Sequence, residues 1–516
     1  MGYRRSRWLF LATTALSLFV AAAIPRPAAA QDLVGVLQTG SQAGHYLSWQ
    51  GDPILPIGDS LTQGWQWTGA NLDYQGYVDA LASRGINTTM IWSYMGATAS
   101  SLQGDSRIGY DSPEYWPWAG SPDNGSFDVT QFNQTYFDSL KSFVAYAEQK
   151  SVLVLITVHD GGAKWSFGGG HPFNDGYGNG PLTAVEQYTE LHDYDNEMPA
   201  TYDASWTRQQ KNQYFQERFC EKLISELQPY SNVMYEMFNE GRNPYDDTQR
   251  KRHEEHFMAF FKARGDNVVF TNADHIDAGY DPHSQPNADV VSWHGDWGDR
   301  FADFQGGFNQ APAMPYFQTE PVPGWDGTNL TIDEIRAGMW QVVMAGAGWV
   351  AQNDASFGWD PNATIASQAA VRDSLYDTVG ICSRFFNGGK VHFWNMKPDG
   401  SLSETGICLA EEGREYVVYA PDGGTFWLDL SGAGTDEFTA QWYDPRTGQW
   451  SAARTVEGGA LRSFTAPDGQ DWVLHVTPEP SSVGLLLTAA VGMLGRRRRR
   501  SPNPKGRCVT QRRPVR

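Results

Sequence analysis

The stretch "VLVLITVHD", residues 152–160, is apolar at nearly every position and ends on two polar residues. It lacks the alternation of a strand with one face in water, so it predicts a strand that is buried on both faces, as in a parallel sheet covered by helices. Seven further runs share this character: "PILPIGD" (53–59), "INTTMIWSY" (86–94), "NVMYEMFNE" (232–240), "DNVVFTNAD" (266–274), "ADVVSWHGD" (288–296), "MPYFQTEP" (314–321) and "AGAGWVAQND" (345–354). Eight such strands close a barrel, so we predict an α/β fold with a (β/α)8 TIM barrel over residues 31–386.

The segments between these runs support a barrel. "DYQGYVDALASRG" (73–85), "FNQTYFDSLKSFVAYAEQKS" (132–151) and "RQQKNQYFQERFCEKLISEL" (208–227) show helical spacing, and the first ends on a glycine suited to a helix C-cap. Residues 105–125 and 160–205 have little regular pattern, and we expect them to build the walls of a cleft on the catalytic face. After residue 386, short alternating strands with Pro-Asp-Gly turns predict a C-terminal antiparallel β-sandwich domain over 387–477.

Both ends of the chain read as targeting segments. Residues 1–30 combine arginines, an apolar run and small residues, which is the layout of a secretory signal peptide cut near Ala30. Residues 478–500, "PEPSSVGLLLTAAVGMLGRRRRR", precede a basic tail at 501–516, and their apolar run is short for a membrane-spanning helix. We expect an exported protein of the cell envelope or extracellular space, with only transient membrane association. A tail anchor is the alternative.

The balance of charges bears on the partners. Residues 31–477 hold 25 basic and 58 acidic residues, a net charge of −33, which argues against nucleic acid as a partner. Four cysteines are too few for a disulfide framework. A disulfide between Cys382 and Cys408 is possible in an oxidising compartment, and the sequence does not decide whether it forms.

Two glutamates close apolar runs at the positions where barrel enzymes place catalytic groups. Glu240 ends "NVMYEMFNE" and Glu320 follows "MPYFQT", where a charged side chain is otherwise costly to bury. Cleavage of a glycosidic bond needs two carboxyl groups, one protonated and one ionised. We therefore predict a glycoside hydrolase that acts on a carbohydrate polymer or oligosaccharide. The structural alternative is that the two glutamates only pair with cations such as Arg242.

These residues resemble the clan of retaining glycoside hydrolases typified by family 5, which carries Asn-Glu at the end of strand four and a lone Glu at the end of strand seven. The resemblance implies that Glu240 is the acid/base, that Asn239 binds the sugar hydroxyl beside the cleaved bond, and that Glu320 is the nucleophile. It implies no cofactor. Two positions depart from the family pattern: Met90 stands where an arginine is usual, and "HGDW" (294–297) where His-x-Tyr is common.

Further resemblances concern the two ends of the folded region and the C-terminal segment. "PIGDSLTQGWQW" (56–67) and the β-rich residues 416–476 are similar to the apiosidase-like (DUF4038) branch, whose small β-domain is named collagen-binding. Residues 478–500 resemble the PEP-CTERM sorting signal. That resemblance implies a sorting or processing protease as a partner at the C-terminus.

Other strand ends supply candidates for substrate binding. A carboxylate holds sugar hydroxyls, an indole ring stacks on the C–H face of a sugar, and a histidine either contacts sugar or only packs with hydrogen bonds. The candidates are Asp59, His159, Trp293, His294, Trp297, Trp349 and Trp359. No metal site is predicted, because "HEEH" (253–256) lacks the zinc-binding His-Glu-x-x-His spacing and is read as a solvated helix face.

Two other functions remain as alternatives. One is a non-catalytic carbohydrate- or matrix-binding envelope protein that keeps the barrel as a scaffold, for which Met90 is the best argument. The other is a serine esterase, because "GDSL" (58–61) places Ser60 in a motif typical of such enzymes. A nucleophilic serine needs a histidine to accept its proton, and the further motifs that would supply one are missing.

Overall fold

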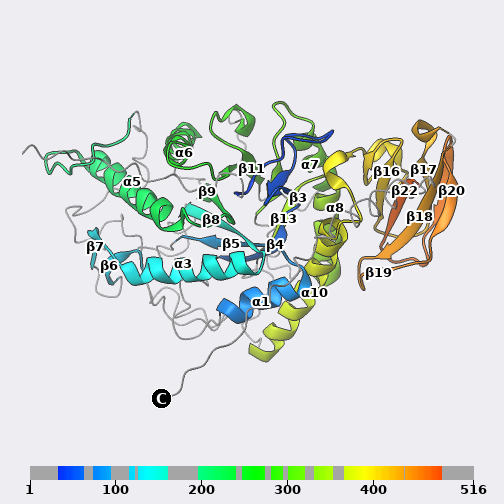
Figure 1. The fold of residues 1–516 in the computed structure, drawn as a ribbon, viewed down its shortest axis with the longest axis horizontal. Coiled ribbons are helices and arrows are strands. Elements are labelled where there is room, and N and C mark those ends of the chain that lie inside the picture. The colour runs from blue at the N-terminus through cyan, green and yellow to red at the C-terminus, as the bar shows by residue number, and fades with distance from the viewer. Residues whose placement is uncertain are drawn as a thin grey trace, which may run out of the picture.

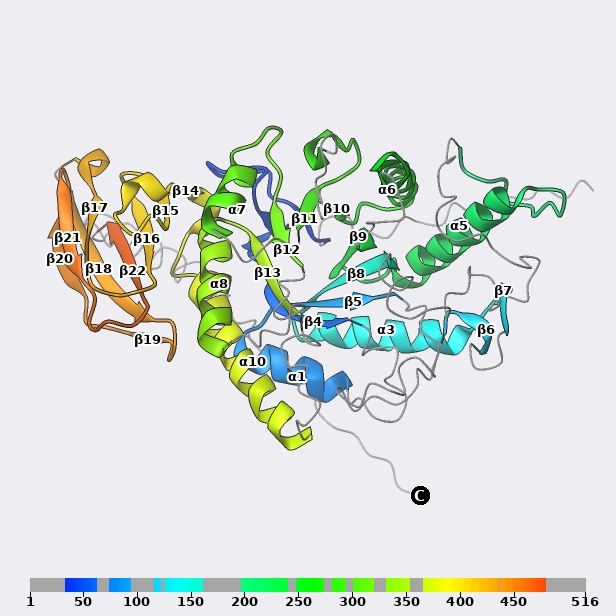
Figure 2. The ribbon, with the colours of Figure 1, turned by 180° about the vertical axis from the view of Figure 1, so that it is seen from behind.

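The structure is a computed structural model of the 516-residue chain. It describes residues 33–62, 74–93, 116–121, 126–160, 196–239, 247–272, 281–293, 300–319, 331–352, 365–434 and 436–478. A barrel with its helices forms one part of the molecule, and a β-rich C-terminal part packs against one side of it (Figures 1 and 2).

Eight parallel strands close the predicted barrel. Their order is β10-β11-β12-β13-β4-β5-β8-β9, so neighbours along the chain are neighbours in space. Each of the eight predicted runs contains one strand, which confirms the (β/α)8 fold. The strands are β4 (Ile57–Thr62), β5 (Thr88–Trp92), β8 (Leu153–Asp160), β9 (Val233–Asn239), β10 (Val269–Asn272), β11 (Val290–Trp293), β12 (Tyr316–Gln318) and β13 (Gly348–Gln352).

Helices cover the outside of the barrel, and their ends follow local chemistry. Gly85 adopts φ 79° just after α1, a left-handed conformation that glycine accepts at a helix C-terminus. Thr207 and Thr331 each close a capping box at the start of α5 and α8. The helices are α1 (Tyr74–Arg84), α3 (Gln134–Gln149), α5 (Arg208–Leu227), α6 (Asp247–Lys262), α7 (Arg300–Phe308), α8 (Ile332–Met344) and α10 (Ile365–Asn387), with a 3-10 turn η5 (Pro282–Ser284).

Strand alternation sorts the barrel residues into an inner and an outer set. One buried cluster fills the lumen with a residue from each of seven strands: Met90, Leu155, Met234, Phe270, Val290, Phe317 and Val350. Their neighbours along each strand pack outward against the helices. A three-stranded sheet consists of β1 (Gly35–Val36), β2 (Leu47–Trp49) and β3 (Asp52–Ile54). Leu47 and Trp49 of β2, together with Val34 just before β1, join the lumen cluster. The sequence pattern did not predict this sheet, because strands of two or three residues are too short to show a period.

The C-terminal residues form the predicted antiparallel sandwich-like domain. A seven-stranded sheet faces the two-stranded sheet β17-β21 across a separate apolar cluster. The strands are β14 (Lys397–Pro398), β15 (Cys408–Glu411), β16 (Glu415–Ala420), β17 (Thr425–Asp429), β18 (Glu437–Asp444), β19 (Gln449–Trp450), β20 (Arg454–Glu457), β21 (Leu461–Thr465) and β22 (Trp472–Pro478), and the 3-10 turns are η6 (Phe393–Asn395), η7 (Gly400–Leu402) and η8 (Ser431–Ala433).

The barrel and the C-terminal domain share one hydrophobic core. Trp340 of α8 stacks on Tyr419 of β16, with ring centroids 5.9 Å apart. Arg336 of α8 donates two hydrogen bonds to Asp471, at 2.7 and 3.0 Å, where both side chains are buried. A buried bidentate pair surrounded by aromatic packing is the character of a permanent interface rather than a mobile joint.

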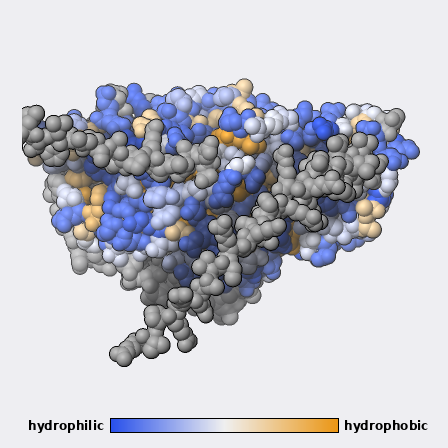
Figure 3. Space-filling view, viewed as in Figure 1, coloured by the Kyte–Doolittle hydropathy of each residue, from blue (hydrophilic) through white to orange (hydrophobic). Residues whose placement is uncertain are grey.

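Three further properties bear on the sequence predictions. Cys220, Cys382 and Cys408 are buried free thiols, so the pairing that the sequence left open is not formed. In the described part of the chain, no helix combines the length and apolarity that crossing a bilayer requires. Figure 3 shows a predominantly hydrophilic face with small scattered hydrophobic patches.

Candidate functional site

Asp59 of β4 lies between the barrel wall and the helices. Its Oδ2 accepts hydrogen bonds from the hydroxyls of Tyr77 on α1 and Tyr376 on α10, both at 3.0 Å, and the side chain is fully buried. Burial and the neighbouring Asp59 raise the pKa of Tyr376 far above its ordinary value, so the hydroxyl stays a donor. The prediction that Asp59 binds sugar is therefore wrong. Its carboxylate is on the outer face of β4 and joins two helices to the barrel.

The glycine and the serine of "GDS" are buried as well. A Cβ at Gly58 would collide with the carbonyl oxygen of Thr88, so only glycine allows β4 to approach β5 this closely. Ser60 follows Asp59 and therefore points the opposite way, into the lumen. Its Oγ is buried and, within the described part of the chain, has no hydrogen-bond partner. Among the described residues no imidazole is bonded to Ser60, so this part of the structure gives no support to the esterase interpretation.

A polar cluster lies inside the lumen on three strands. The Glu236 side chain of β9 is fully buried and accepts hydrogen bonds from Thr157 Oγ1 of β8, at 2.7 Å, and from Ser292 Oγ of β11, at 2.5 Å. Because β10 separates β9 from β11, the bond from Ser292 crosses the inside of the barrel. The carboxylate thus ties three strands together, and each oxygen accepts from a hydroxyl donor.

The two predicted catalytic glutamates follow directly on lumen-forming strands. Glu240 is the next residue after Asn239, the last residue of β9, and Glu320 comes directly after Thr319, which is fully buried. Glu240, Glu320 and the Asn239 side chain lie outside the described residues. The strands that precede them, β9 and β12, run parallel and end at the same edge of the barrel.

His159 at the end of β8 is a packing residue. Its Nδ1 lies 3.1 Å from His253 Nε2 on α6, its Nε2 lies 3.9 Å from Cys220 Sγ on α5, and its ring is fully buried. Burial lowers the pKa of His159 to about 3, so the ring is neutral at pH 7. The packing interpretation is confirmed for His159, and the prediction that it contacts substrate is wrong.

The "HEEH" segment is not the solvated helix face that the sequence predicted. His253 and Glu254 are fully buried, and Glu254 accepts a hydrogen bond from Thr271 Oγ1 of β10 at 2.7 Å. His256 Nε2 lies 2.9 Å from Glu217 Oε1 of α5. These polar groups join α5 and α6 to the barrel wall. Across the described ranges, no cluster of three or more histidine, cysteine or acidic side chains is arranged to hold a metal ion.

The tryptophan candidates divide into two groups. Trp349 of β13 is 1% exposed and belongs to the core between the barrel and its helices, so the prediction that it stacks on substrate is wrong. Trp293 at the end of β11 is half-buried, with its ring centroid 4.9 Å from that of Phe304 on α7. Its contact with substrate stays a prediction. His294, Trp297 and Trp359 lie outside the described residues.

The lumen contains one acidic residue that the sequence interpretation overlooked and one unusual residue that it noted. Glu236 has a sequence signal, since it is a lone carboxylate at an inward position of the otherwise apolar "VMYEMF". Met90, at the position where the family usually has an arginine, is fully buried in the lumen cluster.

The comparisons with known proteins agree with this architecture. Residues 399–477 match the model of a family described as "Putative collagen-binding domain of a collagenase". A solved structure titled "Glycoside hydrolase" is 14% identical with a TM-score of 0.61, and the similarity covers 88% of this chain and 98% of that one. A glycoside hydrolase family 5 from Bacteroides vulgatus is also 14% identical with a TM-score of 0.61, over 87% of this chain and 93% of that one. No curated protein sequence matches the chain. At this identity the similarity shows the fold.

Proposed function

We propose that this chain is an exported retaining glycoside hydrolase that acts on a poly- or oligosaccharide, with Glu240 as acid/base and Glu320 as nucleophile. What carries the proposal is that Glu240 follows β9 and Glu320 follows Thr319 in the sequence, and that β9 and β12 are strands of one closed parallel barrel whose carboxyl ends share an edge. The glycoside hydrolases of the same fold support it by analogy.

The proposed reaction has two steps. In the first, the Glu320 carboxylate attacks the anomeric carbon while Glu240 donates its proton to the leaving oxygen, so that the glycosidic bond breaks and a glycosyl ester forms on Glu320. In the second, Glu240 takes a proton from water, whose oxygen attacks the same carbon and releases Glu320. Two inversions return the original anomeric configuration. Asn239 holds the hydroxyl beside the reacting carbon.

The polar cluster around Glu236 has a positioning role in this proposal. Glu236 lies on β9, four residues before Glu240 in the sequence, and its bonds to Thr157 and Ser292 tie β8, β9 and β11 together. A catalytic pair needs a rigid support, because a shift of about 1 Å in one carboxyl group costs much of the rate.

Export belongs to the same proposal and rests on the two ends of the sequence. The secretory layout of residues 1–30 and the Pro-Glu-Pro segment at 478–500 favour passage to the envelope and removal of the C-terminus by a sorting protease. One observation favours a second function. The match of residues 399–477 to a collagen-binding family fits a matrix-binding protein whose barrel is only a scaffold.

Sugar release from a panel of polysaccharides and plant glycosides tests the proposal. The parent chain is compared with Glu240→Ala and Glu320→Ala, and Glu255→Ala on the outer helix α6 is the matched control. We expect release by the parent and the control, and a loss of at least about a thousandfold in both catalytic variants. Activity that survives both changes removes this pair as the catalytic centre. If the parent releases no sugar from any substrate of the panel but binds one polymer, the scaffold function is favoured.

A further inference from the structure

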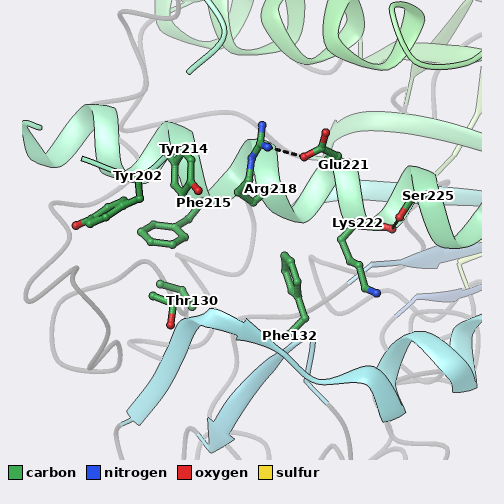
Figure 4. Close-up of a pocket in the computed structure, with 10 residues that line it drawn as sticks. Thr130, Phe132, Tyr202, Tyr214, Phe215, Arg218, Glu221, Lys222 and Ser225 are labelled. Atoms are coloured by element: carbon green, nitrogen blue, oxygen red, sulfur yellow. Dashed lines mark hydrogen bonds and ion pairs between the residues drawn. The ribbon is translucent and has the colours of Figure 1, made fainter. Parts of the chain in front are cut away.

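A cavity of about 560 Å³ lies between β7 and helix α5, away from the lumen (Figure 4). Strand β7 (Ser126–Phe132) pairs with β6 (Trp118–Ser121) in a hairpin that the chain inserts between β5 and α3. Thr130 and Ser225 are exposed at the edge of the cavity, so it is open to solvent. A volume of this order accommodates one or two sugar rings.

The cavity is on the part of the molecule that extends beyond the carboxyl ends of the strands. Lys222 Nζ, in the last third of α5, donates a hydrogen bond to Gln134 Oε1, in the first residue of α3, at 2.8 Å. The part of α5 before Lys222 therefore projects about 20 Å past the start of α3. Figures 1 and 2 both place α5 and the β6-β7 hairpin at the end of the molecule opposite the C-terminal domain. The cavity thus flanks the edge of the barrel where Glu240 and Glu320 follow their strands.

Aromatic rings from three segments form the inside of the cavity. Phe132 faces it from β7, Tyr214 and Phe215 face it from α5, and Tyr202 lies beside them. The centroids of the Tyr202 and Tyr214 rings are 5.7 Å apart, and Tyr214 OH is fixed by a hydrogen bond to Ala200 O at 3.2 Å. Fixed rings on opposite walls offer flat apolar faces to the C–H groups of a sugar at little entropic cost.

The charged groups of the cavity are already paired. Arg218 bonds Glu221 at 2.6 Å, and Lys222 bonds Glu226 at 2.5 Å, so the described walls carry little net charge. A carboxylate ligand would meet no unpaired cation among the described lining residues, whereas a neutral ligand needs none.

We propose that this cavity, which we call the β7-α5 cavity, is a binding subsite for a neutral sugar residue of the substrate chain, remote from the bond that is cleaved. The inference rests on the proposed function, since it names the class of substrate. Tyr214 and Phe132 supply the stacking surfaces for the C–H faces of the sugar ring.

Calorimetric titration tests the subsite in the full chain carrying Glu240→Gln and Glu320→Gln, which prevents cleavage. The probes are β-1,4-linked hexaoses of glucose, mannose and xylose, with hexagalacturonate as the acidic comparison. We expect a neutral hexaose to bind, and Tyr214→Ala to raise its Kd about tenfold through loss of a stacking face. Thr130→Trp, which fills the cavity from its exposed edge, should weaken binding similarly. Tyr214→Phe keeps the ring and should bind as the parent does.

The controls separate the subsite from the catalytic proposal. Trp427, an exposed ring on the C-terminal domain, serves as the matched control, and Trp427→Ala should leave the Kd unchanged. The subsite is overturned if no neutral hexaose binds, if hexagalacturonate binds more tightly than every neutral hexaose, or if both Tyr214→Ala and Thr130→Trp leave the Kd of the bound hexaose unaltered. The parent chain, with both carboxylates intact, is tested separately for sugar release. If it releases no sugar while the cavity variants change the Kd as expected, the hydrolase proposal is overturned and the subsite proposal holds.

Discussion

At the scale of single residues, Asp59 is the clearest case of a functional candidate that proves to be structural. Two tyrosine hydroxyls donate to one oxygen of its buried carboxylate, and they come from helices at opposite ends of the barrel sequence. Such a carboxylate stabilises the fold by satisfying donors that have no access to water.

We predict that Asp59→Ala lowers the free energy of unfolding by about 2 kcal/mol, because the buried Tyr376 hydroxyl loses its acceptor, whereas the Tyr77 hydroxyl keeps Thr89 Oγ1, 2.8 Å away. Urea denaturation at neutral pH measures this loss. Asp52→Ala, an exposed aspartate of β3, is the control and should change stability by less than about 0.5 kcal/mol. If Asp59→Ala leaves the stability unchanged and weakens sugar binding, Asp59 is a substrate-binding residue and not a structural one.

The residue types at the strand ends were predictable from the sequence, and the direction of each side chain was not. A strand that is apolar on both faces shows no alternation, so nothing in "PILPIGD" distinguishes an outward Asp59 from an inward one. The same ambiguity concealed the helix-facing positions of Trp349 and the role of Glu236 in the lumen. Register and tertiary contacts decide these directions.

At the scale of elements, a charged cluster joins α3 to α5 beside the β7-α5 cavity. Glu226 of α5 receives hydrogen bonds from Lys222 of α5 and Gln134 of α3, and it pairs with Lys141 of α3 at 2.6 Å. Burial opposes ionisation of Glu226, but the hydrogen bonds from Lys141, Lys222 and Gln134 outweigh it and lower the pKa of Glu226 to about 2.

This shift predicts a loss of stability in acid. A carboxyl group with a lowered pKa in the folded state stabilises it fully above the unfolded pKa near 4.5, and that contribution is lost as the pH falls towards 2. We expect Glu226→Gln to cost about 1 kcal/mol at pH 7 and to lose less further stability between these pH values than the parent does. Denaturant titrations across this range measure it, with Glu255→Gln on α6 as the control. If Glu226→Gln loses as much stability as the parent when the pH falls over this range, the cluster does not stabilise the contact between α3 and α5.

Elements inside long apolar or periodic runs were predictable, whatever their own length. The eight barrel strands lie in such apolar runs, although β12 has only three residues, and α1, α3 and α5 show helical spacing. The β1-β2-β3 sheet and the β6-β7 hairpin lie in segments without a clear period, although the sequence correctly indicated an antiparallel pattern after residue 386.

At the scale of the whole molecule, the continuous core predicts that the barrel and the C-terminal domain unfold together. Arg336→Ala leaves Asp471 buried without its main partner, which costs about 3 kcal/mol. We expect one calorimetric transition in the parent and one transition at lower temperature in Arg336→Ala. The exposed Arg414→Ala serves as the control and should leave the transition unshifted. Two transitions in the parent, with the barrel transition unaffected by Arg336→Ala, would contradict a shared core.

Trapping of the glycosyl-enzyme tests whether Glu320 is the nucleophile. A 2-deoxy-2-fluoro glycoside of the sugar identified in the release panel slows the second step, so the intermediate accumulates and mass spectrometry of peptides locates the sugar. We expect a sugar ester on Glu320, formed by the parent and absent from Glu320→Ala. A label on another residue, or hydrolysis that inverts the anomeric centre and leaves no label, would contradict the assignment of Glu320 as the nucleophile.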